Sequence, residues 1–308
     1  MYMYLPIALT SVNYLVVVGL GLAVGLLSGL FGVGGGFLMT PLLMMIGIPP
    51  TIAAATDANQ IVAASASGCF SHWRLGNVDI KMGLLLTLGG FAGGAVGVQV
   101  IKALLAAGGA DFLIKMTYVV MLGVVGIFMF FESLSALKKQ KAGTTKEHHA
   151  PKAEKKGGFF ASLPMQTHFE KSGVTHSALV PLVLGVFVGV LAAIMGVGGG
   201  FIMVPVMIYM LRMPMHVVVG TGLFQVLFTC IEVNILQAYS NHTVDFFLAL
   251  LLLIGSVFGA QIGTALGKKL HGDQLKILLA IIVLVVTVKI VLELVLEPSI
   301  LLSYAGGH

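Results

Sequence analysis

Two long apolar segments of the chain carry polar side chains at related positions. In the segment at 52–72 these include Thr56, Asp57, Asn59, Gln60, Ser65 and Ser67. In the segment at 216–238 they include Thr221, Gln225, Thr229, Glu232 and Asn234. Hydroxyl and amide groups can donate hydrogen bonds to the oxygens of a small anion. The predicted ligands of such an anion are Thr56, Asn59, Gln60, Thr221 and Gln225. The alternative is that these groups only join neighbouring helices.

Asp57 and Glu232 are the acidic residues of these two segments, and neither segment contains lysine or arginine. A carboxylate facing lipid is costly, so both side chains are predicted to face the interior of a helix bundle. A permanent negative charge beside an anion path would repel the cargo. We therefore treat both residues as candidates for proton binding. The alternative is a neutral or hydrogen-bonded structural carboxyl.

A glycine-rich sequence occurs twice, as FGVGGGFLMTP from Phe31 and as MGVGGGFIMVP from Met195. We call residues 32–36 and 196–200 the two glycine phrases. Glycine permits a turn before the following helix, and the start of a helix favours an anion. A dinucleotide-binding loop does not fit, because its spacing would need glycine where a phenylalanine follows each phrase. The predicted site residues here are Gly34, Gly35, Gly36, Phe37, Gly198, Gly199, Gly200 and Phe201.

Close helix packing is the alternative role for these glycines. It suits two other rows in which glycine recurs every four residues, namely Gly89, Gly93 and Gly97, and Gly255, Gly259 and Gly263. Small residues at this spacing let helices approach closely in membranes. The rows could serve packing inside one chain or the interface of a homodimer.

The composition places the segments that carry these residues in lipid. Of the 308 residues, 58% are hydrophobic and only 9% are charged, against roughly 25% charged in a soluble domain. The runs 12–56 and 175–211 contain no Asp, Glu, Lys or Arg, and about 20 apolar residues suffice for a helix to cross a bilayer. The net charge of +5 comes largely from one Lys-rich linker, so nucleic acid is not a predicted partner. The two cysteines lie in apolar segments and give no disulfide framework.

An internal repeat organises the chain. Gly32–Pro41 matches Gly196–Pro205, and the match continues through most of each half. Each half contains five apolar segments, of which the second is too short for an ordinary span. An odd number of crossings per half would turn one copy upside down relative to the other. The prediction is an all-α membrane protein with two inverted-topology repeats of about five helical segments each. Its helices would be broken or re-entrant at the GVGGG motifs.

The predicted divisions are a first transmembrane repeat at 1–132, a basic cytoplasmic linker at 133–177 and a second repeat at 178–308. Lysine and arginine near membrane spans favour the cytoplasmic side. With the linker inside, most of the basic loop residues also lie inside, and both termini are predicted outside. His148 and His149 are read as solvated linker residues, so no metal and no cofactor is predicted. No arrangement of nucleophile and base indicates an enzyme.

Several longer stretches resemble the TauE/SafE sulfite-exporter family. They are GLLSGLFGVGGGFLMTPLLMMIGIPP, ATDANQIVAASASG, HWRLGNVDIKMG and the second GVGGGFIMVPVMIYMLRMP followed by VVVGTGLFQV. The resemblance covers nearly the whole chain except the linker, and the duplicated glycine phrase with downstream prolines is its most specific part. Asp57 departs from the glycine–threonine–serine pattern often seen in the family at this place. The resemblance implies transport of sulfite, a sulfonate such as sulfoacetate, or a related sulfur anion.

The resulting expectation is a multi-pass secondary transporter of the bacterial inner membrane. It would export a small sulfur oxyanion or organosulfonate by alternating access, with proton coupling as a further hypothesis. A passive anion channel and an uptake permease for the same anions are the alternatives. A membrane enzyme is not expected.

Overall fold

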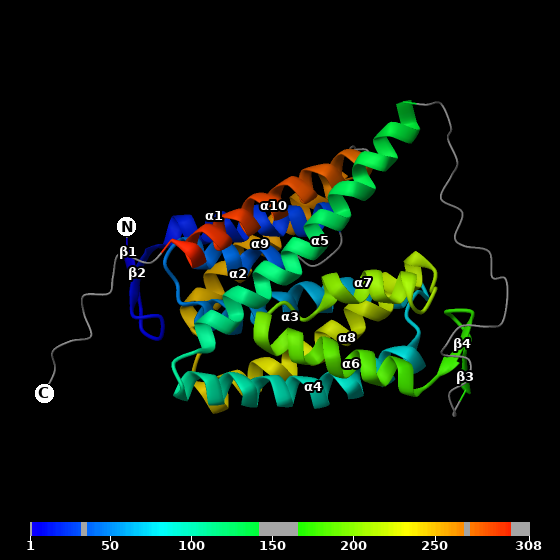
Figure 1. Ribbon diagram of the computed structural model, residues 1–308, viewed down its shortest axis with the longest axis horizontal. Helices are drawn as coiled ribbons and strands as arrows, with labels where there is room; N and C mark the ends of the chain where they lie inside the picture. The colour runs from blue at the N-terminus through cyan, green and yellow to red at the C-terminus, as the bar shows by residue number, and fades with distance from the viewer. Residues whose placement is uncertain (1, 32–35, 142–165, 268–271, 297–308) are drawn as a thin grey trace, which may run out of the picture.

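The computed structural model describes residues 2–31, 36–141, 166–267 and 272–296 (Figure 1). The first half contains β1 (Tyr2–Leu5), β2 (Thr10–Asn13), α1 (Tyr14–Phe31), α2 (Gly36–Met45), α3 (Pro50–Arg74), α4 (Ile80–Ala106) and α5 (Ala110–Lys141). The second half contains β3 (Gln166–Phe169), β4 (Val174–Ser177), α6 (Leu179–Met195), α7 (Gly200–Tyr209), α8 (Met215–Leu236), η2 (Gln237–Asn241), α9 (Phe246–Gly267) and α10 (Gly272–Val295).

All ten predicted apolar segments are helices, and α2 and α7 are the short ones, with 10 residues each. The prediction of helices alone was incomplete, because each half begins with an antiparallel β-hairpin. The two hairpins are equivalent in register: Leu5 pairs with Thr10 in the first, and Phe169 pairs with Val174 in the second. Four-residue strands are too short to appear in the long apolar windows that predict membrane helices.

The linker predicted at 133–177 carries regular structure at both ends. At its start α5 continues to Lys141, where Ala, Leu, Lys and Gln are good helix formers. At its end lies the second hairpin, at 166–177. Residues 142–165, which include His148 and His149, lie outside the described part of the chain. The cytoplasmic position of the linker stays a prediction.

Helices of one half pack mainly against helices of the other half. α1 packs along α9, α4 along α6, α3 along α8 and α5 along α10. The helices run side by side along the long axis, and the two hairpins lie at opposite ends of the bundle (Figure 1). The strongest contacts therefore link the first helix of each half to the fourth helix of the other.

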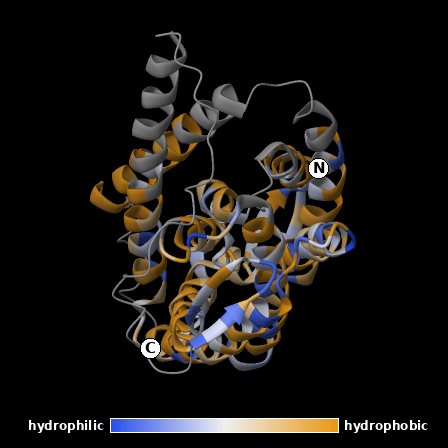
Figure 2. Cartoon of the chain, turned by 90° about the vertical axis from the view of Figure 1, so that its right-hand side faces the viewer, coloured by the Kyte–Doolittle hydropathy of each residue, from blue (hydrophilic) through white to orange (hydrophobic). Residues whose placement is uncertain are grey.

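The surface of the bundle is apolar, as a lipid-facing surface must be. Among the described residues, three helical stretches are long and apolar enough to cross a membrane: Ile80–Ala106, Val217–Asn241 and Phe246–Gly263. On α4 the large apolar side chains Leu84 and Leu88 are exposed. Figure 2, which looks at the end that carries β3 and β4, shows hydrophobic colour over most of the helices. The chain is thus a predominantly helical membrane protein.

The glycine rows of α4 and α9 lie at these inter-half contacts. A Cβ added to Gly93 would lie 2.0 Å from the carbonyl oxygen of Val186 in α6. A Cβ added to Gly259 would lie 2.1 Å from the carbonyl oxygen of Leu22 in α1. These rows therefore serve packing within one chain, and a homodimer stays a prediction.

We expect Gly93→Ala to destabilise the protein strongly, because backbone atoms of α6 occupy the space of the new methyl group and cannot rotate away. The free energy of unfolding should fall by at least the roughly 1–3 kcal/mol that overpacking usually costs. Gly19→Ala in α1 is the matched control, since no atom lies within 4 Å of its added Cβ. The thermal unfolding midpoint in detergent measures both. Equal midpoints for the two variants would contradict this packing.

Candidate transport site

The second glycine phrase forms a left-handed turn between two helices. α6 ends at Met195, and Gly196, Gly198 and Gly199 have φ values of 69°, 67° and 71°. α7 then begins at Gly200. Residues with a Cβ rarely adopt such φ values, which accounts for glycine at these positions. Of the first phrase, Gly34 and Gly35 lie outside the described residues, and α2 begins at the buried Gly36.

The starts of α2 and α7 meet inside the bundle. Phe37 and Phe201, each one residue after a glycine phrase, stack with ring centroids 5.3 Å apart and planes at 27°. Both rings are buried. Stacked rings at this separation are in direct contact. The two predicted site regions, 164 positions apart in the sequence, therefore form one region of the molecule.

Side chains of α3 and α8 border this region. A Cβ on Gly36 would lie 2.2 Å from Ile61 Cδ1 and 3.5 Å from Asp57 Oδ2. A Cβ on Gly198 would lie 2.5 Å from Cys230 Sγ and 3.5 Å from Ile61 Cγ2. Ile61 thus reaches both phrases. Residues of the polar helices α3 and α8 therefore lie against Gly36 and Gly198.

Asp57 belongs to a buried polar network of the first half. The Thr40 hydroxyl in α2 donates a hydrogen bond to Asp57 Oδ2 at 3.0 Å. Tyr118 in α5 interacts with Thr40 and Asp57, and its hydroxyl donates to the carbonyl oxygen of Met195 at 2.5 Å. All three side chains are fully buried. The network therefore connects Asp57 to the residue that precedes the second glycine phrase.

Sequence reasoning missed Thr40 and Tyr118. A signal for Thr40 was present in the repeat, because the second copy has Val204 at the matching position and Gly222 where the first has Asp57. The hydroxyl and its carboxyl partner thus change together between the halves. Tyr118 gave no comparable signal, since its contacts depend on how α5 packs.

Glu232 lies in a different environment from Asp57. A Cβ on Gly94 of α4 would lie 2.6 Å from Glu232 Oε2, so the carboxyl faces the α4 glycine row. Gln225 shares this side of α8 and donates to Thr229 Oγ1 at 3.1 Å. The two carboxyls, predicted as a pair, therefore contact different helices: Asp57 lies against α2, and Glu232 lies against α4.

Thr56 and Thr221 hold the starts of two helices. The backbone N–H of Asp245 donates to Thr56 Oγ1 at 3.1 Å, and the N–H of Asp79 donates to Thr221 Oγ1 at 3.0 Å. These hydrogen bonds give a structural reason for threonine at the matching position of each half. Each hydroxyl acts here as an acceptor, so its own O–H could still donate to an anion. Cargo binding by the two threonines stays a prediction.

Asn59 and Gln60 lie on neighbouring faces of α3. Asn59 donates to the carbonyl oxygen of Thr56 at 3.3 Å and accepts a hydrogen bond from Asn234 of α8. Asn59 thus joins the two polar helices, the packing role that was its alternative. Gln60 is buried, with 3% of its surface exposed.

Four buried oxygens of the predicted site and proton-binding residues have no hydrogen-bond partner within the described part of the chain. They are Asp57 Oδ1, Gln60 Oε1, Gln225 Oε1 and Glu232 Oε2. A buried acceptor without a donor costs roughly 1–3 kcal/mol. The carboxyl oxygens can take a proton, and the amide groups can rotate to present N–H donors instead. The site can therefore exchange hydrogen bonds with a polar cargo.

Buried polar groups around a helix break, inside a bundle with an apolar surface, are features of membrane transporters. The family comparison agrees: the model of the sulfite exporter TauE/SafE family matches residues 17–290. The chain belongs to this family.

Two bacterial relatives are similar over most of their length, and a plant relative is similar over a shorter part. The probable membrane transporter protein YunE of Bacillus subtilis is 26% identical over 278 residues, which cover 88% of this chain and 94% of that protein. YjnA of the same organism, also named a probable membrane transporter protein, is 27% identical over 85% of this chain and 94% of its own length. Sulfite exporter TauE/SafE family protein 1 of Arabidopsis thaliana is 31% identical over 38% of this chain and 26% of its own. No solved structure matches the chain.

Proposed function

We propose that the protein is a secondary transporter that exports sulfite or an organosulfonate such as sulfoacetate by alternating access. The contact between Phe37 and Phe201 carries this proposal, because it brings the starts of α2 and α7 together inside the bundle. A helix start carries roughly half a positive charge. Two of them directed at one place favour an anion without a fixed cation. The family name supports a sulfur oxyanion as the cargo.

Inverted topology is part of the proposal. Each half consists of a hairpin followed by five helices, yet the hairpins lie at opposite ends of the bundle (Figure 1). A two-fold relation between the halves requires each contact between them to occur twice in equivalent form, unless it joins equivalent helices. The packing of α1 on α9, of α4 on α6 and of α3 on α8 follows this pattern.

Proton coupling through Asp57 is the second part of the proposal. Its carboxyl has one hydrogen-bond donor, Thr40, and no ion pair among the described residues. The titratable neighbours on the packed helices are Tyr118 of α5 and Cys230 of α8, neither of which supplies a positive charge. Proton binding would remove the cost of a buried carboxylate when an anion approaches.

Flux into proteoliposomes tests the function. Sulfite, thiosulfate, sulfoacetate, taurine and sulfate are compared with and without a pH gradient. We expect movement of sulfite or a sulfonate, little movement of the zwitterion taurine, and acceleration by the gradient. Absence of flux for every sulfur anion would contradict the proposed cargo. Flux that is indifferent to the gradient would remove proton coupling alone.

Membrane topology gives a separate prediction. With the linker in the cytoplasm, single cysteines placed at residue 150 and near residue 2 should differ in their accessibility to an impermeant thiol reagent in intact cells. An impermeant maleimide should label the cysteine near residue 2 and should label the linker cysteine only after permeabilisation. Labelling of the linker in intact cells, with protection of the amino terminus, would contradict the predicted orientation.

A further inference from the structure

The β-hairpins dock at equivalent places, each on the half to which it does not belong. The second hairpin reaches Asp79, which precedes α4 of the first half. Ser172 donates to Asp79 Oδ2 from its backbone N–H at 3.1 Å and from its hydroxyl at 2.6 Å. The first hairpin reaches Asp245, which precedes α9, where Ile7 N–H donates to Asp245 Oδ2 at 3.2 Å.

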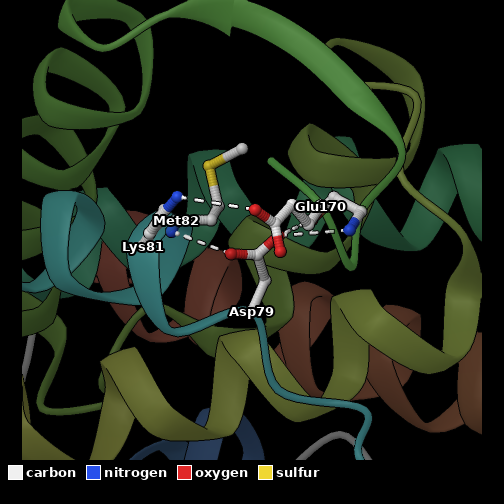
Figure 3. Close-up of polar contacts among 5 residues, drawn as sticks. Asp79, Lys81, Met82 and Glu170 are labelled. Carbon is white, nitrogen blue, oxygen red and sulfur yellow. Dashed lines mark hydrogen bonds and ion pairs between the residues drawn. The ribbon is translucent and has the colours of Figure 1, made fainter. Parts of the chain in front are cut away.

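Each aspartate also caps the helix that it precedes. Asp79 Oδ1 accepts from Met82 N–H at 3.2 Å (Figure 3), and Asp245 Oδ1 accepts from Leu248 N–H at 3.1 Å. A capping carboxylate at a helix start is held there by the backbone N–H groups and the helix dipole. One carboxylate therefore connects a hairpin to the first turn of a transmembrane helix.

The same two aspartates connect to the candidate site. Their backbone N–H groups donate to Thr221 and Thr56, as described above. Thr56 immediately precedes Asp57 in α3, and Thr221 lies one turn before Gln225 in α8. A hairpin is thus linked through a capping aspartate to each of the two helices that carry the polar residues of the site.

Each hairpin also inserts an apolar side chain into its end of the bundle. Leu5 and Phe169, which occupy equivalent positions, are fully buried. Leu5 belongs to a core cluster that includes Ala53 of α3, and Phe169 to one that includes Val218 of α8. The cluster around Phe169 contains four methionines, whose side chains adapt easily to a changed partner.

We propose that the hairpins are two latches, and that Asp79 and Asp245 are the positioning residues that tie each latch to a site helix. Release of one hairpin opens its end of the bundle while the other stays docked. This inference rests on the alternating-access function proposed above, which needs one end closed whenever the other is open. Both latches are closed in the structure.

The two latches are unequal. The second hairpin gives Asp79 two hydrogen bonds. Its ion pair between Lys81 Nζ and Glu170 Oε1, at 4.0 Å (Figure 3), is exposed and contributes little to this difference. The first hairpin gives Asp245 one hydrogen bond. Hydrogen bonds to a charged group are the stronger kind. The resting protein should therefore open more often at the end that carries the first hairpin.

Cysteine accessibility tests the proposal without a cargo. In a background with Cys69 and Cys230 replaced by Ala, single probes are introduced as Ala53→Cys and Val218→Cys, one in the core cluster that contains Leu5 and one in the cluster that contains Phe169. Both parent side chains are fully buried. A small maleimide is applied to membrane vesicles of both orientations. We expect Ala53→Cys to react faster than Val218→Cys in the otherwise unchanged protein.

Variants of one latch should then change the labelling rate of the probe at that end of the bundle and not the rate at the other end. Ser172→Ala removes one hydrogen bond to a carboxylate and should raise labelling of Val218→Cys roughly tenfold, with no rise at Ala53→Cys. Leu5→Ala should raise labelling of Ala53→Cys by roughly tenfold or more, with no rise at Val218→Cys. Glu170→Ala is the control, because its ion pair is exposed, and it should change neither probe. Equal increases at both probes would show general loosening and would overturn the proposal, as would no change.

A cross-link provides a test that leaves the buried residues intact. Lys81→Cys with Glu170→Cys, joined by a short bifunctional methanethiosulfonate that forms a disulfide with each thiol, would fix the second hairpin to α4. Flux of labelled sulfite should be normal before cross-linking, stop after it, and return on reduction. Full flux in the cross-linked protein would overturn the latch. Selective labelling without sulfite flux in any variant would contradict the proposed cargo and leave the latch standing.

Discussion

Asp57→Asn is expected to abolish the response of net flux to a pH gradient while one-for-one exchange of the anion continues. Asparagine retains an oxygen that can accept from Thr40 but cannot take up or release a proton. One pH unit corresponds to about 1.4 kcal/mol per proton, so a pH gradient should change the steady-state anion ratio of the unchanged protein roughly tenfold per unit if one proton is coupled to each anion. The variant should only equilibrate. Exchange and gradient-driven flux in proteoliposomes measure the two properties.

Two comparisons make the Asp57 result specific. Asp111→Asn, the same chemical change at the exposed start of α5, should leave both activities unchanged. Glu232→Gln tests the second carboxyl, which lies against Gly94 and outside the Thr40 network. A variant of Asp57 that is still driven fully by the gradient would exclude it as the proton site. Loss of folded protein with Asp57→Asn would assign it a structural role.

Gly198→Val should stop transport. Its φ of 67° is unfavourable for a β-branched residue, and the added Cβ would lie 2.5 Å from Cys230 Sγ and 2.7 Å from Val226 Cγ1. Left-handed strain alone costs roughly 1–3 kcal/mol, and overpacking adds to it. The expected result is loss of flux with folded protein still recovered, because the displaced atoms belong to side chains and the distortion is confined to the turn.

Gly47→Val separates backbone strain from the filled space at the site. Gly47 has a φ of 90°, but nothing lies within 4 Å of its added Cβ. It should lose stability and keep transport activity per folded molecule. The quantities compared are the sulfite flux and the yield of monodisperse protein for each variant. Near-normal flux through Gly198→Val would remove the second glycine turn from the mechanism.

Much of the helical architecture could be predicted from hydropathy alone. Apolar runs with few charged residues account for the ten α-helices of the described residues, and the duplicated phrase located the break between α6 and α7. The hairpins could not be found in this way, because strands of four residues bury a single side chain such as Leu5 or Phe169. Their positions depend on Asp79 and Asp245, whose recurrence is visible in the sequence but whose partners are not.

The candidate site was predictable in composition and less so in contacts. Asp57 of α3 does lie beside Gly36 in the interior, as expected for a carboxyl that is costly to expose to lipid. The described neighbours of Gly198 from α8 are Cys230 and Val226. Helical periodicity, however, gives only the face of a helix and not the helix that it meets. It placed Asp57 and Glu232 in one role, although they contact α2 and α4 respectively. It also omitted Tyr118, which enters the network from α5.

Counterflow of sulfite tests alternating access at a single anion site most directly. Proteoliposomes loaded with unlabelled sulfite are diluted into a trace of labelled sulfite without a pH gradient. A carrier returns from the inner face with its site open outward, so the label should rise transiently above its equilibrium level and then decline. A channel leaves the label to approach equilibrium without an overshoot. An overshoot that disappears in Gly198→Val is the predicted result, and a monotonic rise in the unchanged protein would contradict the carrier mechanism.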